Sequence, residues 1–599
     1  MAEHRTDYIP RETARTLHGL FRERIRRSPQ VVGYTHYDRH RETWRDYTWQ
    51  EMGEWVDRCQ LALQRENLQK GDRVGILLRN CPSWVVFEQA ALGLGLVVVP
   101  LYTNDRPENI GYILEDAGIR ILLFQDALHW QVLSDIYPRL GNVQTLLSIE
   151  PVSETHDMRL KTFADWLPDE AGHVERPTIE PGDLATIVYT SGTTGNPKGV
   201  MLSHDNILWN ATAAASCETF YTDDVFLSFL PLSHMFERTA GYYLPMVVGA
   251  RIAYARSIEQ LAEDLQIVRP TILITVPRIF ERVYNRINDQ LAKKPPLARK
   301  LFEKAVEVGW HRFQYRQGRA PWSPKLLLWP LLDRMVARKI RDRLGGRLRL
   351  AVSGGAPLSP EIARTFIGLG ITISQGYGMT ELSPVVCTNR LDDNRPETVG
   401  QPLPDVEVKL GEHDELLVRS PGVMLGYWNL PEATAETIDA EGWLHTGDVA
   451  RIEGDHIIIT GRLKDIIVLA TGEKVPPADM ELAIATDPLF EQVMIVGEGK
   501  PFLSALVVLD TEHWQRLAGE LGFEADPANL EHPHVEKALL ERINRKLSRF
   551  PGYARVIRAH ARLEPWTIED GFITPTMKLK RKPLHAEYEA VIDQLYKGH

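Results

Sequence analysis

The stretch "YTSGTTGNPKGV", residues 189 to 200, determines how the rest of this 599-residue sequence is interpreted. It places a run of serine, threonine and glycine directly before a single lysine, Lys198. Glycines let a loop turn tightly and bring backbone N–H groups against an anion. A lysine adds a point charge that reaches phosphate oxygens. The composition therefore predicts a loop that holds phosphate.

This loop differs from the common P-loop, G-x-x-x-x-G-K-[ST]. Counting from Gly192, Pro197 stands where the second glycine belongs, and Gly199 stands where the metal-binding hydroxyl belongs. Proline also lacks the backbone N–H that a P-loop uses. The alternative to a phosphate site is an ordinary surface loop between a strand over 185–189 and a helix. If the loop does bind phosphate, it serves a chemistry other than that of P-loop enzymes.

Composition excludes several classes of protein. A net charge of −11 argues against general nucleic-acid binding. The four cysteines lie far apart without a C-x-x-C pair, which indicates neither a disulfide framework nor a zinc cluster and suits a reducing cytoplasm. The N-terminal residues are polar, unlike a signal peptide, and no apolar run approaches the roughly 18 residues of a membrane span. We expect a cytoplasmic enzyme of several domains or subdomains.

Apolar strands alternate with helical patterns through the first two-thirds of the chain. This alternation predicts parallel or mixed sheets covered by helices, and hence an α/β fold. A β-rich subdomain is expected to follow at about 400–460, because the pattern there changes to short antiparallel strands. The expected strands lie at 74–78, 97–101, 121–124, 225–230, 251–254, 271–275, 348–352, 371–375, 406–410, 415–419 and 456–460, and the expected helices include 84–94 and one from Pro360.

The last 130 or so residues carry their own strands, at 492–496 and 504–509, and their own helices. They predict a small α+β domain. We therefore expect a large domain over 1–463 and a smaller C-terminal domain over 464–599.

One segment, 285–344, differs in charge from the rest of this acidic chain. It contains 15 Lys and Arg against 5 Asp and Glu, with Trp310, Trp322 and Trp329 among them. Basic residues with interfacial tryptophan can dock on anionic lipid. The alternative, which we favour from the sequence, is a solvated helical hairpin.

Five further motifs follow the loop along the chain. Taken alone, each is weak: an aspartate in a Thr-Gly-Asp sequence is more often a turn residue than a ligand, and a basic run near a C-terminus is more often solvated. In this order they are very specific. They are "SGGAP" (353–357), "GYGMTE" (376–381), "WLHTGD" (443–448), "GRLKD" (461–465) and "TPTMK" (574–578).

With these motifs the chain resembles the adenylate-forming enzymes, which include acyl-CoA synthetases, peptide-synthetase adenylation domains and firefly luciferase. The resemblance covers roughly residues 40 to 585. Within that family, "FLPLSHMFER", "GEKVPP" and "ITPTMKLKR" are most similar to long-chain fatty acyl-CoA synthetases, as is the basic segment 285–344. The resemblance implies ATP, Mg²⁺ and CoA as cofactor and cosubstrates, and a long-chain fatty acid as substrate. A fatty carboxylate would attack the α-phosphate of ATP to give acyl-AMP and pyrophosphate, and the CoA thiol would then displace AMP.

The resemblance also implies a distorted β-barrel at about 400–460, a mobile C-terminal domain joined by a hinge, and roles for individual residues. Phosphate oxygens would be held by the loop and its lysine, and magnesium by a threonine and a glutamate. A C-terminal lysine would bridge the carboxylate and the α-phosphate, and a histidine would stand near the acyl carboxylate, although it could equally begin a helix. These residues are Ser191, Gly192, Thr193, Thr194, Gly195 and Lys198 for the β- and γ-phosphates; Thr190 and Glu381 for magnesium; Gly355, Gln375, Gly376 and Tyr377 for adenine; Thr380 for the α-phosphate; Asp448 and Arg462 for ribose; Lys578 for the reacting groups; His234 for the carboxylate; Lys464 for the hinge; and Gly472 for the pantetheine tunnel.

The sequence departs from the family at Val468, where many relatives carry a lysine, which puts one polar contact to nucleotide or CoA in doubt. Two other functions stay open. A fatty acyl-AMP ligase, which passes its product to a carrier protein, keeps every nucleotide motif and differs mainly by an insertion near the hinge. No insertion is obvious in "GRLKDIIVLATGEKV" (461–475). A non-catalytic nucleotide sensor could lose Lys578 or Glu381 without cost, yet both are present. Acyl chain length and oligomeric state do not follow from the sequence.

Overall fold

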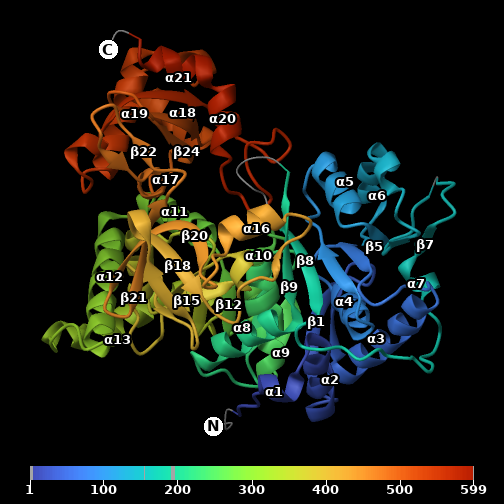
Figure 1. Cartoon of the computed structure of the whole chain (residues 1–599). Coiled ribbons are helices and arrows are strands. Elements are labelled where there is room, and N and C mark those ends of the chain that lie inside the picture. Colours follow the sequence, from blue (N-terminus) through green and yellow to red (C-terminus); the bar gives the residue numbers. More distant parts are fainter. Residues whose placement is uncertain (1–4, 154, 191–195, 598–599) are drawn as a thin grey trace.

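The fold is seen in a computed structural model, which describes residues 5–153, 155–190 and 196–597 (Figure 1). Two large sheets lie side by side in the N-terminal part of the chain, and a small domain, orange to red in Figure 1, sits above one of them. The expected α/β class is confirmed.

The first large sheet has nine strands, in the order β16-β15-β14-β13-β12-β10-β11-β1-β2. Its central strands are parallel, as the strand–helix alternation predicts. The hairpin β1–β2 at one edge was not anticipated. The strands are β1 Val32–Asp38, β2 Thr43–Thr48, β10 Val225–Ser228, β11 Arg251–Tyr254, β12 Ile272–Thr275, β13 Leu350–Ser353, β14 Ile373–Gly378, β15 Val385–Thr388 and β16 Gln401–Pro402.

The second large sheet has eight strands, in the order β19-β9-β8-β4-β3-β5-β6-β7. It is parallel from β8 to β7, while β9 pairs antiparallel with both β8 and β19. The strands are β3 Arg73–Leu77, β4 Val97–Pro100, β5 Ile119–Phe124, β6 Thr145–Ser148, β7 Leu160–Thr162, β8 Leu184–Thr190, β9 Lys198–Ser203 and β19 Gly426–Tyr427.

Helices between the two large sheets form the main core. Helix α4 buries nearly continuous apolar sequence because it contacts protein on all sides, whereas α2 and α3 bury one apolar face. Inside this core Arg238 and Glu88 form a fully buried ion pair. The helices are α2 Leu17–Arg27, α3 Trp49–Gln64, α4 Pro82–Gly93, α8 His204–Ser216, the π-helix η2 Glu237–Tyr243 and α9 Leu244–Val248.

A four-stranded antiparallel sheet follows, in the order β17-β18-β20-β21. A bridge between Gly400 and Ile457 joins it to the end of the nine-stranded sheet, so that it forms an open half-barrel where a distorted barrel was expected. The strands are β17 Glu407–Leu410, β18 Glu415–Arg419, β20 Leu444–Glu453 and β21 His456–Arg462.

The basic segment is helical, as expected. Helix α12 does not stand free in solvent, because it buries Phe302, Ala305 and Val308 against its neighbours, among them α15. The helices here are α11 Pro277–Ala292, α12 Pro296–Arg316, η3 Pro324–Leu328, α13 Trp329–Leu332, η4 Asp333–Ala337 and α14 Arg338–Arg343, followed by α15 Pro360–Gly368.

The C-terminal domain has a three-stranded sheet, β24-β25-β26, and a small hairpin, β22–β23. Its apolar side chains form clusters of their own: among the described residues, no cluster of buried side chains has members on both sides of residue 464. The elements are β22 Ile467–Val468, β23 Lys474–Val475, α17 Pro477–Ala485, β24 Phe490–Val496, β25 Leu503–Leu509, α18 Thr511–Leu521, α19 Pro533–Lys546, β26 Val556–Arg562, α20 Arg581–Glu587 and α21 Glu589–Leu595.

Charged side chains at the surface join the C-terminal domain to α11. His513 Nε2 lies 3.3 Å from Asp289 Oδ1, and Arg516 Nη1 lies 3.9 Å from the same oxygen. Arg278 Nη2 lies 3.9 Å from Glu491 Oε1. Exposed ion pairs of this kind contribute little stability each, so these contacts orient the domain without fixing it strongly.

Candidate active site

A cleft of about 2690 Å³ lies between the N-terminal part and the C-terminal domain. Strand ends of both large sheets, the half-barrel and the C-terminal domain all contribute to its walls. The cleft brings together most of the residues singled out in the sequence: Thr190, Lys198, His234, Gly355, Gln375, Gly376, Tyr377, Thr380, Glu381, Asp448, Arg462, Lys464 and Lys578.

The glycine-rich loop connects two antiparallel strands. Thr190 ends β8 and Lys198 begins β9, and the two residues are partners in the register. A helix was expected directly after the loop; instead β9 follows, and helix α8 begins only at His204. The short apolar run of Val200, Met201 and Leu202 fits a strand, but a run of three residues is too short to distinguish a strand from a helix. Ser191, Gly192, Thr193, Thr194 and Gly195 lie outside the described residues.

Lys198 belongs to a three-residue cluster on the wall of the cleft. Its Nζ lies 4.8 Å from the centre of the Tyr427 ring, a cation–π contact. The Tyr427 hydroxyl donates a hydrogen bond of 2.9 Å to Glu381 Oε1. Burial and this carboxylate raise the pKa of Tyr427. Tyr427 therefore joins two predicted site residues, although the sequence analysis missed it.

Tyr377, Asp448 and Arg462 form a second cluster. The Tyr377 hydroxyl donates to Asp448 Oδ2 at 2.6 Å, and Arg462 Nε donates to Oδ1 of the same carboxylate at 2.9 Å. Burial raises the pKa of Tyr377 well above its usual range, and Asp448 adds to that effect. The short hairpin between β20 and β21 sets this geometry, because Asp448 and Arg462 are cross-strand partners. Asp448 is thus a buried, oriented carboxylate rather than a solvated turn residue.

Near Gly355, Gln375 and Gly376, the wall of the cleft is formed mainly by backbone. Gly355 has φ of +81°, a conformation that favours glycine, and a Cβ there would meet little. The amide of Gln375 is already engaged: its Oε1 accepts from the Leu358 N–H at 3.2 Å and its Nε2 donates to the Pro396 carbonyl. The side chain of Gln375 therefore shapes this wall, and contacts with a ligand fall to the backbone around it.

The "TPTMK" motif forms a tight turn that presents Lys578. The Thr574 hydroxyl accepts from the Lys578 N–H at 3.0 Å, and the Thr574 N–H donates to the Lys578 carbonyl at 2.8 Å. Met577 has φ of +64°, the left-handed conformation that closes the turn. The motif's threonine therefore fixes the backbone from which the lysine projects.

Lys578 and Lys580 face different surroundings. Lys578 remains open to the cleft on one side, while the cleft walls desolvate it and, together with Arg462, lower its pKa. Asp448 and Glu381 act on that pKa in the opposite direction, so the ammonium lies between both clusters. Desolvation also lowers the pKa of Lys580, but its charged neighbours are Arg106 and Asp105.

His234 directly precedes the helical residues Met235 and Phe236, which lead into η2. Its Nδ1 accepts from the Phe236 N–H at 3.2 Å, which is how a residue caps a helix. Burial and the charge of Lys578 lower the pKa of His234 to about 4, so the ring is neutral near pH 7. His234 therefore lies at the start of a helix, as one interpretation expected, and it also lies near Lys578.

Gly472 lies outside this cleft. It occupies the turn of the β22–β23 hairpin with φ of +92°, and a Cβ there would meet no atom within 4 Å. Val468 on the same hairpin is 37% exposed and pairs in register with Lys474, so a lysine stands directly across from the position where relatives carry one. Lys464 lines the cleft at the junction of the two domains.

The residues expected to hold magnesium suit that ion. Glu381 offers a carboxylate and Thr190 a hydroxyl on the same cleft, and hard oxygen ligands are those that magnesium prefers. Two protein ligands are enough where substrate phosphates complete the shell. No group of three or more His, Cys, Asp or Glu able to hold a metal occurs among the described residues, which is compatible with so sparse a site.

Two protein families match most of the chain that forms this cleft. Residues 21–428 match the AMP-binding enzyme family, and residues 464–599 match the AMP-binding enzyme C-terminal domain. The chain belongs to the AMP-binding enzyme family. Among similar curated proteins, long-chain-fatty-acid–CoA ligase FadD15 of Mycobacterium bovis is 32% identical over 573 residues, which covers 92% of each chain. The peroxisomal long chain acyl-CoA synthetase 6 of Arabidopsis thaliana is 30% identical and covers 92% of this chain and 82% of its own.

Solved structures of this family share the fold. The adenylation domain of a carboxylate reductase from Mycobacterium chelonae superposes with a TM-score of 0.76 at 22% identity, covering 97% of this chain and 91% of its own. Anthranilate CoA ligase AuaEII, solved with anthranoyl-AMP, gives 0.75 at 18% identity, covering 98% and 99%. The resemblance seen in the sequence is therefore confirmed at the level of family and fold.

Proposed function

We propose that this member of the AMP-binding enzyme family is a long-chain fatty acid–CoA ligase that forms acyl-AMP from a fatty acid and ATP and then acyl-CoA. The observation that carries the proposal is the cleft itself. It gathers Lys198, the Asp448–Arg462 ion pair and the C-terminal Lys578 in one place. The names of its relatives at about 30% identity support the choice of substrate.

The proposed roles follow the two clusters. Lys198 and the loop before it hold the β- and γ-phosphates, and Tyr427 keeps Lys198 and Glu381 at a fixed separation. Asp448, oriented by Tyr377 and Arg462, accepts the ribose hydroxyls. Glu381 and Thr190 hold magnesium, which when bound neutralises phosphate charge. Catalysis then consists mainly of positioning and charge neutralisation, so no Ser-His-Asp triad is needed.

Lys578 is proposed to bridge the fatty carboxylate and the α-phosphate. It donates to both anions while negative charge moves from one to the other, with Thr380 on the α-phosphate. His234, neutral at pH 7, lines the path of the carboxylate without adding charge. The nearby acids Glu381 and Asp448 help to keep the ammonium protonated in a cleft that otherwise disfavours it.

The acyl chain is proposed to occupy the apolar end of the same cavity. Its lining comes from β10, the η2–α9 helix, β12 and β13, and it carries no charge. Apolar area removed from water supplies the binding energy, at about 0.8 kcal/mol per methylene. The residues proposed for this channel are Phe226, Phe236, Ala240, Leu244, Ile274, Leu350 and Val352.

The second step is proposed to need another arrangement of the C-terminal domain, now residues 464–599. With Lys578 at the cleft, Gly472 lies away from it, so one static arrangement does not serve both residues. A rotation about Lys464 would bring the hairpin with Gly472 to acyl-AMP and open a path for CoA. The separate hydrophobic cores on either side of residue 464 support such a movement.

A fatty acyl-AMP ligase that loads a carrier protein is the second candidate. The hinge region disfavours it, because β21 ends at Arg462 and the chain enters the β22–β23 hairpin at Ile467 without an added element.

We further infer that the enzyme acts in the cytoplasm, with peripheral contact to a membrane. No described helix is both long enough and apolar enough to pass through a bilayer.

The test is a panel of carboxylic acids from short to long chain, incubated with ATP and magnesium, with and without CoA. We expect AMP release to depend on long-chain acids and acyl-CoA to appear with CoA. Acyl-AMP that accumulates, and is consumed only when a carrier protein is added, would establish the second candidate instead.

A further inference from the structure

The helical run from η3 to α14, residues 324–343, has an unusual outward surface. Its inward side is conventional: Trp329, Leu332 and Ala337 are buried against α12 and Leu369. On its outward side, large apolar side chains are exposed at positions where a solvated helix usually carries polar residues. We call them, together with the tryptophan just before the run, the apolar face: Trp322 (56% exposed), Leu327 (72%), Leu328 (45%), Leu331 (59%) and Met335 (41%).

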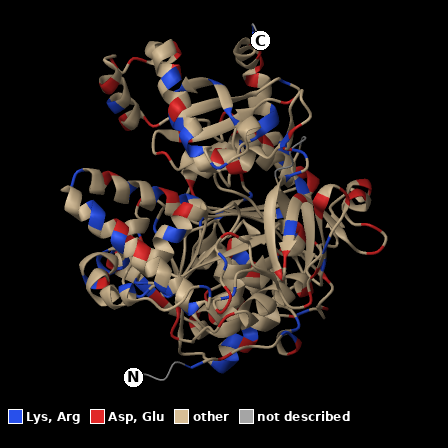
Figure 2. Cartoon of the chain, turned by 90° about the vertical axis from the view of Figure 1, so that its left-hand side faces the viewer, with Lys and Arg blue, Asp and Glu red and all other residues tan. Residues whose placement is uncertain are grey.

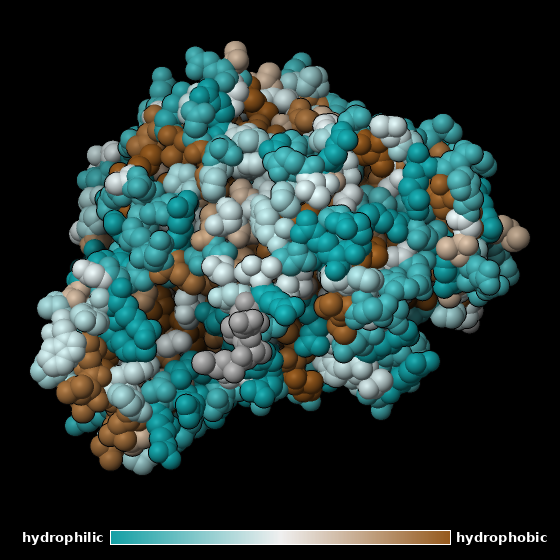
Figure 3. Space-filling model, turned by 90° about the horizontal axis from the view of Figure 1, so that it is seen from below, coloured by the Kyte–Doolittle hydropathy of each residue, from teal (hydrophilic) through white to brown (hydrophobic). Residues whose placement is uncertain are grey.

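These residues are close in sequence and share a side of the helix. Leu327 and Leu331 are four residues apart, as are Leu331 and Met335, and residues at that spacing are neighbours on a helix surface. Figure 3 shows apolar side chains gathered at the left edge of the molecule, on the side where α13 lies in Figure 1. Single exposed apolar residues need no explanation, but a contiguous group marks an interaction site.

Cations border the apolar face. Arg334, Arg338 and Lys339 are exposed on the next turns of the run. The run also holds two acids: Asp333 is paired with Arg341 at 2.7 Å, and Asp342 is exposed, so cations outnumber acids in the run by six to two. Figure 2, turned toward this side of the molecule, shows Lys and Arg along these helices. A basic surface on a chain of net charge −11 favours an anionic partner.

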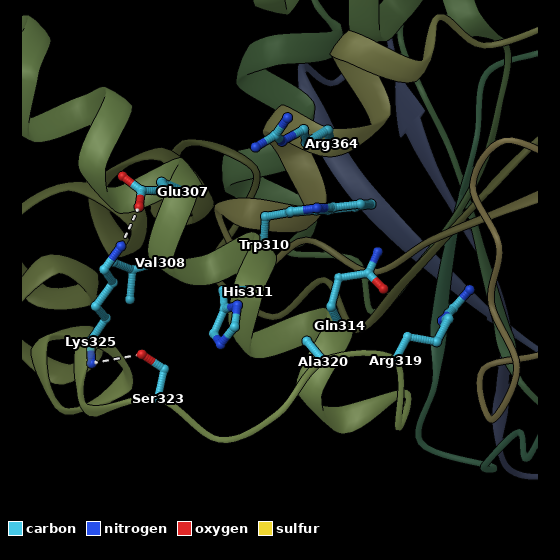
Figure 4. A pocket seen from close by; sticks show the side chains of 10 residues that line it. All are labelled: Glu307, Val308, Trp310, His311, Gln314, Arg319, Ala320, Ser323, Lys325 and Arg364. Carbon is cyan, nitrogen blue, oxygen red and sulfur yellow. Dashed lines mark hydrogen bonds and ion pairs between the residues drawn. The ribbon is translucent and has the colours of Figure 1, made fainter.

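A cavity of about 300 Å³ opens beside the apolar face, between α12 and the segment that leads into η3 (Figure 4). Ser323 and Lys325, which lie between Trp322 and Leu327 in the chain, line it together with Arg319 and Arg364. Its acid, Glu307, is paired with Lys304 at 2.9 Å and with Lys325 at 3.4 Å. The cavity is therefore cationic and large enough for a phosphate-bearing headgroup.

We propose that the apolar face and this cavity together form a docking surface for anionic phospholipid bilayers. The leucines and Trp322 enter the boundary between headgroups and acyl chains, where tryptophan is favoured. The cavity receives one phosphate headgroup, and the outer arginines contact others. The inference deepens the proposed function and rests on it for its purpose, since a fatty acid substrate is found in membranes.

Vesicle flotation tests the surface directly. We expect the full chain to float with vesicles of phosphatidylglycerol and phosphatidylcholine, and to be released by salt, but not to float with phosphatidylcholine alone. The double variant Leu327→Ser/Leu331→Ser should bind at least tenfold more weakly. Its control is Leu128→Ser/Met158→Ser, which removes two strongly exposed apolar side chains elsewhere (70% and 92%) and should bind like wild type.

Removal of single positive charges at the cavity is the second test of the docking surface. Lys325→Ala and Arg364→Ala should each weaken vesicle binding about fivefold, the effect expected of one cation at an anionic surface. Free glycerol 3-phosphate should not compete; competition at millimolar concentration would make the cavity a site for soluble phosphates and overturn the proposal. Equal flotation of both double variants would also overturn it, as would concentration-dependent self-association that the leucine variant abolishes.

The ligase assay with a soluble acid keeps the two proposals apart. All these variants should keep wild-type activity in solution, because none of the residues lies at the cleft. Absent activity with intact flotation would reject the proposed function and leave the docking surface standing. Intact activity with no flotation would reject the docking surface alone.

Discussion

Replacing Lys578 with alanine tests the proposed chemistry most sharply, because a matched control lies two residues away. The Lys578 ammonium lies among Glu381, Asp448 and Arg462, whereas the charged neighbours of Lys580 are Asp105 and Arg106. A single oriented donor that faces developing charge contributes about 10²–10³ in rate. Lys578→Ala should therefore slow acyl-AMP formation by at least that factor, and Lys580→Ala should slow it less than about threefold.

Two assays separate the half-reactions. Exchange of labelled pyrophosphate into ATP, dependent on fatty acid, reports the first step. Conversion of supplied acyl-AMP to acyl-CoA reports the second, which Lys578→Ala should leave within a few-fold of wild type. If Lys580→Ala stops exchange while Lys578→Ala does not, the register of the motif is wrong. Equal damage to both half-reactions by Lys578→Ala would refute the alternation of the C-terminal domain.

Three other predictions address the metal, a buried acid and the turn at Gly472. Glu381→Gln and Lys198→Ala should both weaken ATP use by about tenfold or more, but only the glutamine variant should recover as magnesium is raised; the same magnesium response in both would contradict the assignment. Burial raises the pKa of Glu237 to about 8 in the folded chain, so the unfolded chain loses its proton first and stability falls as pH rises from about 4.5 to about 8. Glu237→Gln should abolish that fall, on the order of 4 kcal/mol, in denaturant titrations at pH 5 and pH 8.5; an unchanged pH dependence would exclude a buried neutral acid. Gly472→Leu should slow the thioester step by tenfold or more and spare pyrophosphate exchange, while Gly472→Ala, with the same backbone strain and less bulk, should be milder; equal effects would make the backbone rather than the tunnel responsible.

The fold followed from the sequence wherever periodicity was strong. The strands at β3, β4, β5, β12 and β13 begin and end within two residues of the expected bounds, because a strand buried on both faces reads as a short apolar run. The hairpin β1–β2 was missed. Its residues are largely polar and half-buried, as an edge strand's are, and give no apolar run.

Some residues of the candidate site could likewise be predicted from the sequence, and others could not. Residues within motifs, such as Asp448 and Lys578, could be found because their order along the chain is distinctive. Tyr427 could not, because its contacts with Lys198 and Glu381 arise only when β19 pairs with β9. Gln375 was expected to bind a ligand, yet its side chain amide bonds to backbone. Such distinctions depend on which groups tertiary packing has already satisfied.

The independent core of the C-terminal domain has a consequence for how such an enzyme can change. Lys578 is held by a turn whose supports all lie within that domain, whereas the proposed acyl channel is built wholly from the other one. Substitutions that widen or shorten the channel need not disturb the lysine. Substrate range and chemical step can therefore vary separately, and exchange of the C-terminal domain with that of a relative should preserve chain-length preference.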